Sequence, residues 1–249
     1  MFCLRLFQLL KNNGFKLEDV DDVVKCEIVD RINRFLVKVV IDGFSTIAYM
    51  NNTGRLSEFL VTGKKAYCLK TYGGKTGHRL FAVDVEDGMA AIIDTKIQMR
   101  LFEKAVNEGL IYWLGKCRIV KRNCRLGRSL IDYLVELDGR LAYLEVKSAV
   151  LRNDRGYAMY PDCLTLRGRK HIMEIIKHTE GGGLGIILFI AALPYVSAFK
   201  PNPMGDAEIP KLLLKAYEVG CILKAISMHY DGYSSSFYLD NSDIPVVLQ

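Results

Sequence analysis

Residues 128–148 read RSLIDYLVELDGRLAYLEVKS, and this stretch decides how the second half of the chain is interpreted. Its centre, Asp138-Gly139, is a dipeptide that a two-residue type I′ turn prefers, because both central residues of that turn need positive φ. The flanking runs are rich in Ile, Tyr, Val and Leu, which favour strands. The stretch therefore predicts a β-hairpin.

A two-residue turn also fixes which residues of the two strands face each other. The expected pairs, from the turn outward, are Leu137 with Arg140, Val135 with Ala142, Tyr133 with Leu144, and Ile131 with Val146. One face of the hairpin is then almost wholly apolar. On the other face, Asp132 is expected directly across from Glu145, and Lys147 follows two residues later on that face.

The opposed acids are the unusual feature of this hairpin. Facing carboxylates, with Cβ atoms about 4.5–5.5 Å apart, repel each other and weaken strand pairing. A shared proton, a neighbouring cation or a bound metal normally compensates. The alternative is a solvated strand face on which two acids happen to align, and spacing alone favours neither explanation.

A metal at this position would give the hairpin a chemical role. Oxygen ligands from Asp132 and Glu145 suit Mg²⁺ or Mn²⁺, and the main-chain carbonyl of Val146 is a natural additional ligand. Such an ion neutralises a phosphodiester oxygen and activates water. Lys147 would orient that water or stabilise charge in the transition state. The pattern is that of a phosphodiester-cleaving site.

Positive charge gathers just before the hairpin. The net charge is +6, and the excess lies mainly between residues 100 and 170. A basic run is usually a solvated surface, but beside paired carboxylates it suits a site for a polyanion. We therefore expect nucleic-acid contacts from the basic residues nearest the hairpin, namely Lys121, Arg122, Arg125 and Arg128.

Two predicted helices flank the hairpin. Apolar residues at helical spacing predict one from Lys96 to near Gly109, and Glu103 on it is a candidate metal ligand, although an exposed helix glutamate is the simpler explanation. A second helix is expected to begin at the N-cap Thr165, with Leu166, Ile172, Ile175 and Ile176 turned inward. At its start, further candidate phosphate contacts are Arg167, Lys170 and His171, with an exposed basic helix end as the alternative.

The chain as a whole predicts two domains, residues 1–95 and 96–249. Short β-like runs separated by turn signals between Lys16 and Asp94 indicate a small closed barrel or sandwich, and an OB-type barrel matches the size. The later order of helices, hairpin and strands predicts an α/β domain with a mixed sheet. The GGKT sequence at Gly73–Thr76 is not a phosphate-binding loop, because a strand-like run and not a helix follows it.

Composition and cysteine content indicate the class of protein and its cellular compartment. Half of the residues are apolar and a quarter are charged, as in a globular protein. No apolar run is long enough to span a membrane, and the N-terminus lacks the features of a secretory signal. The seven cysteines are scattered without a CxxC pair, which argues against a zinc site or a disulfide framework. We expect a cytoplasmic protein.

Several short motifs, taken in order, resemble the sugar fermentation stimulation protein family (SfsA). They are Arg31–Phe35 (RINRF), Asn52–Leu56 (NTGRL), Ser129–Asp132 (SLID), Glu145–Lys147 (EVK), Tyr160–Asp162 (YPD) and Arg167–His171 (RGRKH). The resemblance runs through most of the chain. It implies an N-terminal OB-fold domain, a C-terminal domain of PD-(D/E)XK nuclease type, DNA binding, and a regulatory link to sugar utilisation in bacteria.

The resemblance also implies roles for individual residues. Asp132, Glu145 and Lys147 would be the nuclease-type triad. The residues on the OB domain where nucleic acid would bind are Arg31, Arg34, Asn52 and Arg55. The chain departs from the family pattern at Tyr49, Asn51 and Leu130. It also departs near Lys121, a position at which the family has an acidic residue.

Three functions follow from these observations. The first is a DNA-binding protein of low sequence specificity that uses both domains. The second is an active Mg²⁺-dependent endonuclease or exonuclease. The third is a catalytically inert nuclease fold that serves as a regulatory or protein-interaction module. The oligomeric state stays open, with a homodimer as one option.

Overall fold

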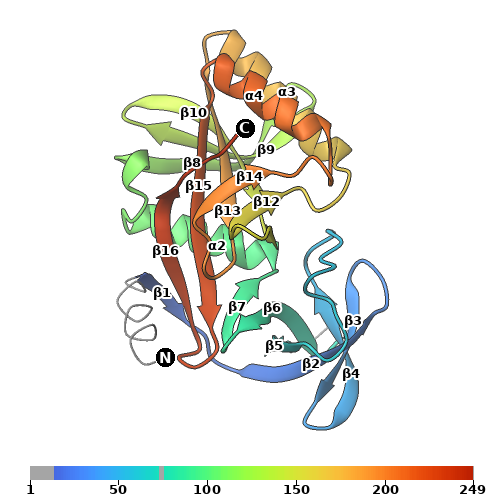
Figure 1. Cartoon of the computed structure of the whole chain (residues 1–249). Coiled ribbons are helices and arrows are strands. Elements are labelled where there is room, and N and C mark those ends of the chain that lie inside the picture. Colours follow the sequence, from blue (N-terminus) through green and yellow to red (C-terminus); the bar gives the residue numbers. More distant parts are fainter. Residues whose placement is uncertain (1–13, 73–75, 249) are drawn as a thin grey trace.

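The computed structural model describes residues 14–72 and 76–248. Its N-terminal part contains strands β2 (Val23–Arg31), β3 (Leu36–Ile41), β4 (Phe44–Met50), β5 (Lys65–Lys70) and β6 (His78–Glu86). They pair in the order β4-β3-β2-β5-β6, and a parallel pairing of β4 with β6 joins the two ends. The result is the small closed barrel that the sequence predicts, at the bottom of Figure 1.

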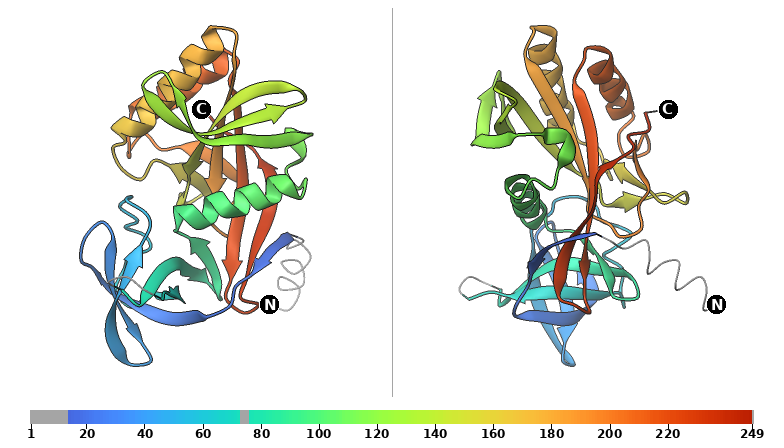
Figure 2. Two further views of the ribbon diagram at one scale, coloured as in Figure 1. Left: turned by 180° about the vertical axis from the view of Figure 1, so that it is seen from behind. Right: turned by 90° about the vertical axis from the view of Figure 1, so that its left-hand side faces the viewer.

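The C-terminal part is an α/β unit. Its main elements are α2 (Thr95–Asn107), β8 (Cys117–Leu126), β9 (Ser129–Leu137), β10 (Arg140–Ser148), α3 (Leu166–Glu180), β13 (Leu184–Ala191), α4 (Glu208–Glu218), β15 (Ile222–Asp231) and β16 (Ser236–Ile244). Strands β10, β13 and β15 run parallel, whereas β8, β9 and β16 pair antiparallel with their neighbours. The predicted mixed sheet is therefore confirmed. In Figures 1 and 2, α3 and α4 lie together at the end far from the barrel, and α2 crosses the middle.

The barrel and the α/β unit share one continuous sheet. Strand β7 (Met89–Ile92) pairs with β6 on one side and with β15 on the other, where Ala90 faces Tyr230. Strand β1 (Phe15–Asp19) pairs with β16, so the first described strand joins the C-terminal sheet. A separate small sheet contains β11 (Leu151–Arg152), β12 (Tyr157–Tyr160) and β14 (Ala198–Pro201). The single 3-10 turn among the described residues, η1 (Tyr112–Leu114), follows α2.

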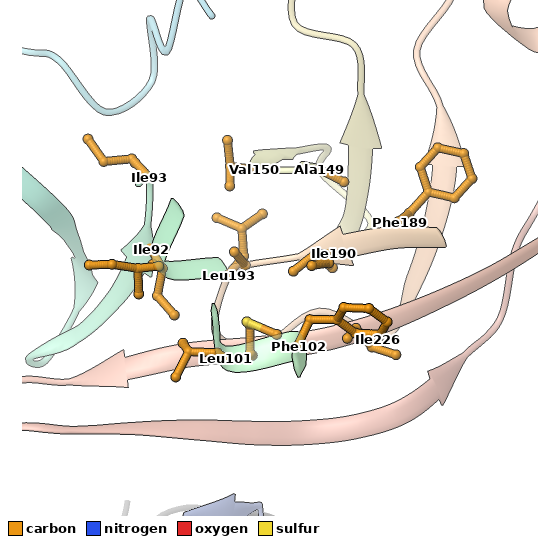
Figure 3. Close-up of a cluster of buried hydrophobic side chains, with 14 of the residues drawn as sticks. Ile92, Ile93, Leu101, Phe102, Ala149, Val150, Phe189, Ile190, Leu193 and Ile226 are labelled. Atoms are coloured by element: carbon orange, nitrogen blue, oxygen red, sulfur yellow. The ribbon is translucent and has the colours of Figure 1, made fainter. Parts of the chain in front are cut away.

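The apolar core is continuous across the junction. Figure 3 shows buried side chains from β7, α2, β13 and β15 in one cluster, among them Ile92, Leu101, Phe102, Ile190 and Ile226. Each of these is fully buried. Burial of apolar area is the dominant favourable contribution to folding, so the barrel and the α/β unit stabilise each other.

Both helices that flank the hairpin have a capped N-terminus, and the predicted N-cap of the second, Thr165, is confirmed. Asp94 caps α2 by accepting hydrogen bonds from the N–H groups of Lys96 and Ile97, and it also pairs with Arg79 of the barrel at 2.5 Å. Thr165 caps α3 through a 3.2 Å hydrogen bond from the N–H of Gly168. The inward residues of α3 are as predicted except for Leu166, which is 67% exposed.

The error at Leu166 has a geometric cause. Leu166 lies six positions before Ile172, and at about 3.6 residues per turn this places it roughly 120° around the helix from Ile172. Seven strands also escaped prediction, namely β1, β7, β8, β11, β12, β14 and β16. The charged side chains of β8 hid its strand character, because it is the edge strand of the sheet.

Two further expectations, on the GGKT sequence and on the cysteines, concern residues that lie partly outside the described ranges. Gly73, Gly74 and Lys75 of the GGKT sequence lie outside it, but β6 follows as the expected strand from His78. Cys3 also lies outside it, and the cysteines inside it form no disulfide. No helix within residues 14–72 and 76–248 has the length and apolar character needed to cross a membrane.

The shared core predicts cooperative unfolding. We expect Leu101→Ala to lower the free energy of unfolding by about 2–4 kcal/mol, because it removes buried side-chain volume beside both halves of the molecule. Far-UV circular dichroism in urea should show one transition, shifted to lower urea. Leu141→Ala, at a position that is 57% exposed, is the matched control and should change little. Two separate transitions would contradict the shared core.

Candidate phosphodiester site

The hairpin β9–β10 has the predicted register over most of its length. The pairs run from Leu137 with Arg140 at the turn to Tyr133 with Leu144, and Asp138 and Gly139 have the positive φ angles of the expected turn. The register ends there. The expected pairing of Ile131 with Val146 and of Asp132 with Glu145 is therefore wrong, because regular main-chain pairing of β9 with β10 stops at this point, whereas β10 stays paired with β13 along its other edge as far as Ser148.

The two acids lie where the strands separate, and their side chains replace main-chain pairing. The N–H of Val146 donates to Oδ2 of Asp132 at 2.8 Å. In return, the N–H of Asp132 donates to Oε2 of Glu145 at 3.4 Å. Each carboxylate thus bonds to the opposite strand. The acids are close together, as expected, although not as a regular cross-strand pair.

Glu145 is buried with two hydrogen-bonding partners, the Lys147 ammonium and the His171 imidazole. Its Oε1 accepts hydrogen bonds from Nζ of Lys147 and from Nδ1 of His171, the latter at 2.6 Å. All three side chains are at least nine-tenths buried. Burial alone would raise the pKa of Glu145, but Lys147 and His171 outweigh it and hold that pKa below its usual range. The same carboxylate raises the pKa of Lys147 against the opposing effect of burial.

Asp132 has no such compensation. Burial and the adjacent charge of Glu145 raise its pKa to about 6, and Lys147 offsets this only in part. Among the described residues, no Lys, Arg or His side chain forms an ion pair with it. Asp132 is therefore the acid whose negative charge would gain most from an added cation.

The basic strand β8 divides into two faces. Arg122 lies across from Tyr133 and donates to both carboxylate oxygens of Glu103, each at 2.6 Å. The Tyr133 hydroxyl also donates to Glu103, at 2.9 Å. Both carboxylate oxygens of Glu103 thus accept hydrogen bonds, and these bonds tie α2 to the edge of the sheet. Glu103 and Asp132 both line a cleft of about 400 Å³.

The other face of β8 carries further exposed basic residues. Lys121 and Arg125 lie across from Leu134 and Leu130, so they alternate with Arg122 and share the face of Asp132. Both are exposed, as is Arg128 in the turn to β9. The structure thus brings part of the predicted basic surface to the side of the hairpin that carries the unpaired acid.

The start of α3 contributes one inward residue and two outward ones. His171 is 6% exposed and lies against Glu145, whereas Arg167 and Lys170 are exposed. Arg167 donates from Nε to Nε2 of His171 at 3.3 Å, which links the surface to the buried carboxylate. His171 therefore supports the site from inside, a role that the sequence did not indicate because the partners are remote in the chain.

The predicted barrel contacts also divide into two kinds. Arg31 donates to the carbonyls of Gly54 and Arg55, at 2.6 and 2.7 Å, and so holds the loop after β4. Asn52 fixes the same loop through its amide, which donates to the carbonyl of Ile93 at 2.8 Å. Arg34 and Arg55 have exposed side chains and remain available to a ligand.

A metal ion at the hairpin would need further ligands in addition to the side chains of Asp132 and Glu145. Within the described ranges, no group of three or more His, Cys, Asp or Glu side chains is arranged to hold an ion. Glu145 keeps Oε2, and Asp132 keeps both carboxylate oxygens, without an ion-pair partner among the described residues. Main-chain oxygen and water would have to complete the shell, as is common for Mg²⁺.

Comparison with known proteins identifies the family. The family model described as the sugar fermentation stimulation protein RE domain matches residues 96–234, and the SfsA N-terminal OB domain matches residues 29–92. The chain belongs to the SfsA family. A sugar fermentation stimulation protein homolog from Pyrococcus furiosus is 43% identical over 216 residues, which cover 87% of this chain and 93% of the relative. An Archaeoglobus fulgidus homolog is 42% identical over 234 residues, or 94% of this chain and 100% of the relative.

A solved SfsA structure supports the same assignment. Pyrococcus furiosus SfsA in complex with Ca²⁺ aligns with a TM-score of 0.89 and 40% identity, over 94% of this chain and 100% of that chain. The family predicted from the ordered motifs is confirmed, and the barrel is its OB domain.

The raised pKa of Asp132 predicts a pH-dependent effect of Asp132→Asn. The folded-state pKa of about 6 exceeds the ordinary value of 3.8, so the ionised side chain destabilises the fold as pH rises through 6. Without divalent metal, we expect the variant to unfold at higher temperature than wild type at pH 7.5, by the equivalent of about 1–3 kcal/mol. The difference should vanish near pH 4. Thermal denaturation in EDTA measures it, and equal stability at pH 7.5 would contradict it.

Proposed function

We propose that this SfsA-family protein binds DNA with low sequence specificity, and that its C-terminal unit is a nuclease-type domain with a metal-dependent phosphodiester site. The observation that carries the proposal is the arrangement at the hairpin. Asp132 and Glu145 lie side by side where β9 and β10 separate, and Lys147 is held against Glu145. Two acids beside one lysine are the groups that metal-assisted hydrolysis of a phosphodiester needs.

The residues fit a hard divalent cation. Asp132 and Glu145 would hold Mg²⁺ or Mn²⁺, with the carbonyl of Val146 as a further oxygen. The raised pKa of Asp132 supports this, because a cation would stabilise the charged form that burial disfavours. The related structure from Pyrococcus furiosus was solved with Ca²⁺, which also prefers oxygen ligands. When bound, the ion would polarise the phosphodiester and lower the pKa of water.

The protein side chains would supply position and charge. The buried ammonium of Lys147 is fixed by Glu145, so it would meet the reacting phosphate without reorganisation. His171 holds the same carboxylate from α3 and limits its movement. Arg167 at the surface would neutralise an adjacent phosphate while staying bonded to His171.

DNA would reach this site over exposed basic residues from both domains. Lys121, Arg125 and Arg128 lie on or beside β8, and Arg167 and Lys170 lie at the start of α3. Arg34 and Arg55 extend the surface onto the OB barrel. Contacts of this kind bind phosphates and carry no sequence information, which accounts for the proposed low specificity.

Active cleavage is the second candidate, favoured by the intact Asp132, Glu145 and Lys147. An inert regulatory module in the cytoplasm, with the family's link to sugar utilisation, would keep the DNA surface without turnover. A metal-dependent rise in melting temperature would favour a working site over an inert one, because a ligand that binds only the native state must stabilise it.

Cleavage is tested with Lys147→Gln and Asp132→Asn. Wild-type protein should nick supercoiled plasmid in Mg²⁺ or Mn²⁺ and not in EDTA. We expect both variants to lose at least about a hundredfold in rate, the scale of removing one transition-state contact. Mg²⁺ should raise the melting temperature of wild type but not of Asp132→Asn. Equal nicking by all three proteins would show that the activity comes from elsewhere.

DNA binding is tested by reversing charge on β8. In a fluorescence-anisotropy titration, the double variant Lys121→Glu/Arg125→Glu should weaken duplex binding by at least about tenfold. It should also reduce the slope of log K against log salt by about two, because two phosphate contacts are lost. Lys211→Glu/Lys215→Glu on α4 makes the same charge change away from the hairpin and should leave affinity unchanged. Equal weakening by both doubles would argue against a defined surface.

A further inference from the structure

A pocket between the two domains adjoins the proposed phosphodiester site. It has a volume of about 330 Å³ and is lined on one side by the barrel loop at Asn52–Leu56 with Arg34, and on the other by β10–β12 and the segment before α3. Ser148, in its wall, directly follows Lys147. Tyr160, also in the wall, lies close enough for its hydroxyl and the Lys147 ammonium to interact electrostatically.

The pocket is preformed because both domains fix its barrel wall. Arg31 holds the carbonyls of Gly54 and Arg55 from within the barrel. From the other domain, the Asp162 carboxylate accepts a 3.0 Å hydrogen bond from the N–H of Leu56. Gly54 is required for this approach, since a Cβ there would lie 2.6 Å from the Asp162 carboxylate.

The lining mixes apolar side chains with polar ones, among them Asn52, Thr53 and Asp162. Leu56, Val150 and Met159 supply the apolar surface. The Ser148 hydroxyl oxygen is buried and has no hydrogen-bond partner among the described residues, and the exposed Arg34 guanidinium lies at the barrel side. A flat group with apolar faces, a polar edge and an attached phosphate matches this combination, and the volume lies near the lower end of the range for small-ligand sites, about 300–1,000 Å³.

We propose that this interdomain pocket receives one unpaired nucleotide of the DNA substrate, with its base between the two domains and a phosphate near Arg34. The inference rests on the proposed function and narrows it to DNA that carries an unpaired or extruded base. A base pair is too large for the pocket, whereas one base enters by unstacking from its neighbours. That cost is lowest for a base that is already unpaired.

Binding in Ca²⁺ tests the inference without relying on cleavage. Two labelled duplexes are compared that differ only by one unpaired thymidine. Wild type should bind the duplex with the unpaired base at least about tenfold more tightly, within the range expected for stacking one base on protein. Leu151→Trp, which fills the pocket from β11, should abolish this preference and leave affinity for the perfect duplex within about twofold. Leu214→Trp on exposed α4 is the matched control and should keep the preference.

A photocrosslink in wild-type protein covers the case in which Leu151→Trp is misfolded. With 5-iododeoxyuridine at the unpaired position, we expect attachment within residues 52–56 or 148–165. Equal affinity of wild type for both duplexes, a preference that survives in folded Leu151→Trp, or attachment elsewhere would each overturn the pocket assignment and leave DNA binding standing. Failure to bind either duplex would instead overturn the proposed function.

Discussion

One buried carboxylate, Glu145, organises the candidate site. An isolated buried charge is very costly, so it persists only with close partners. Lys147, on the same strand, and His171, on α3, both bond to its Oε1. These contacts join the hairpin to the helix behind it and give the Lys147 ammonium a single position. Removing any one of the three would leave a buried charge or a buried imidazole without its partner.

Asp132, the neighbouring acid, has no such close partners among the described residues, and the two carboxylates therefore differ in pKa. Glu145 is neutralised and its pKa is lowered, whereas burial and the charge of Glu145 raise the pKa of Asp132 to about 6. Pairs of titratable groups whose environments separate their pKa values often mark functional sites. Here the separation follows from geometry, since Lys147 and His171 both bond to Glu145 and neither bonds to Asp132. In the proposed site, Glu145 would be a fixed anchor, and Asp132 would supply the charge that responds to a ligand.

Local signals in the sequence predicted much of this, and remote contacts account for the rest. The Asp138-Gly139 turn and the alternating residues were sufficient for the hairpin and most of its register, because both depend on neighbours in the chain. The regular register ended at Tyr133 and Leu144, because beyond them the Asp132 and Glu145 side chains accept hydrogen bonds from main-chain N–H groups of the opposite strand in place of main-chain pairing. The contact of His171 with Glu145 and the pairing of β1 with β16 join distant segments, and no periodicity in a single sequence encodes them. Charge on β8 concealed a strand, since an edge strand tolerates polar residues on both faces.

The connection between the domains gives the barrel a direct part in the site. The loop at Asn52–Leu56 is held from the barrel by Arg31 and from the C-terminal unit by Asp162, while the apolar core of Figure 3 continues beneath the junction. A hinge would need few contacts between the domains and a solvent-exposed backbone. This junction instead has a continuous buried core and a loop that is bonded from both sides. DNA that touches Arg34 on the barrel and Lys121 on β8 would therefore meet two surfaces at a fixed separation. Such a protein would select its substrate by the shape and local unpairing of the DNA, because phosphate contacts at a fixed spacing respond to geometry and not to base sequence.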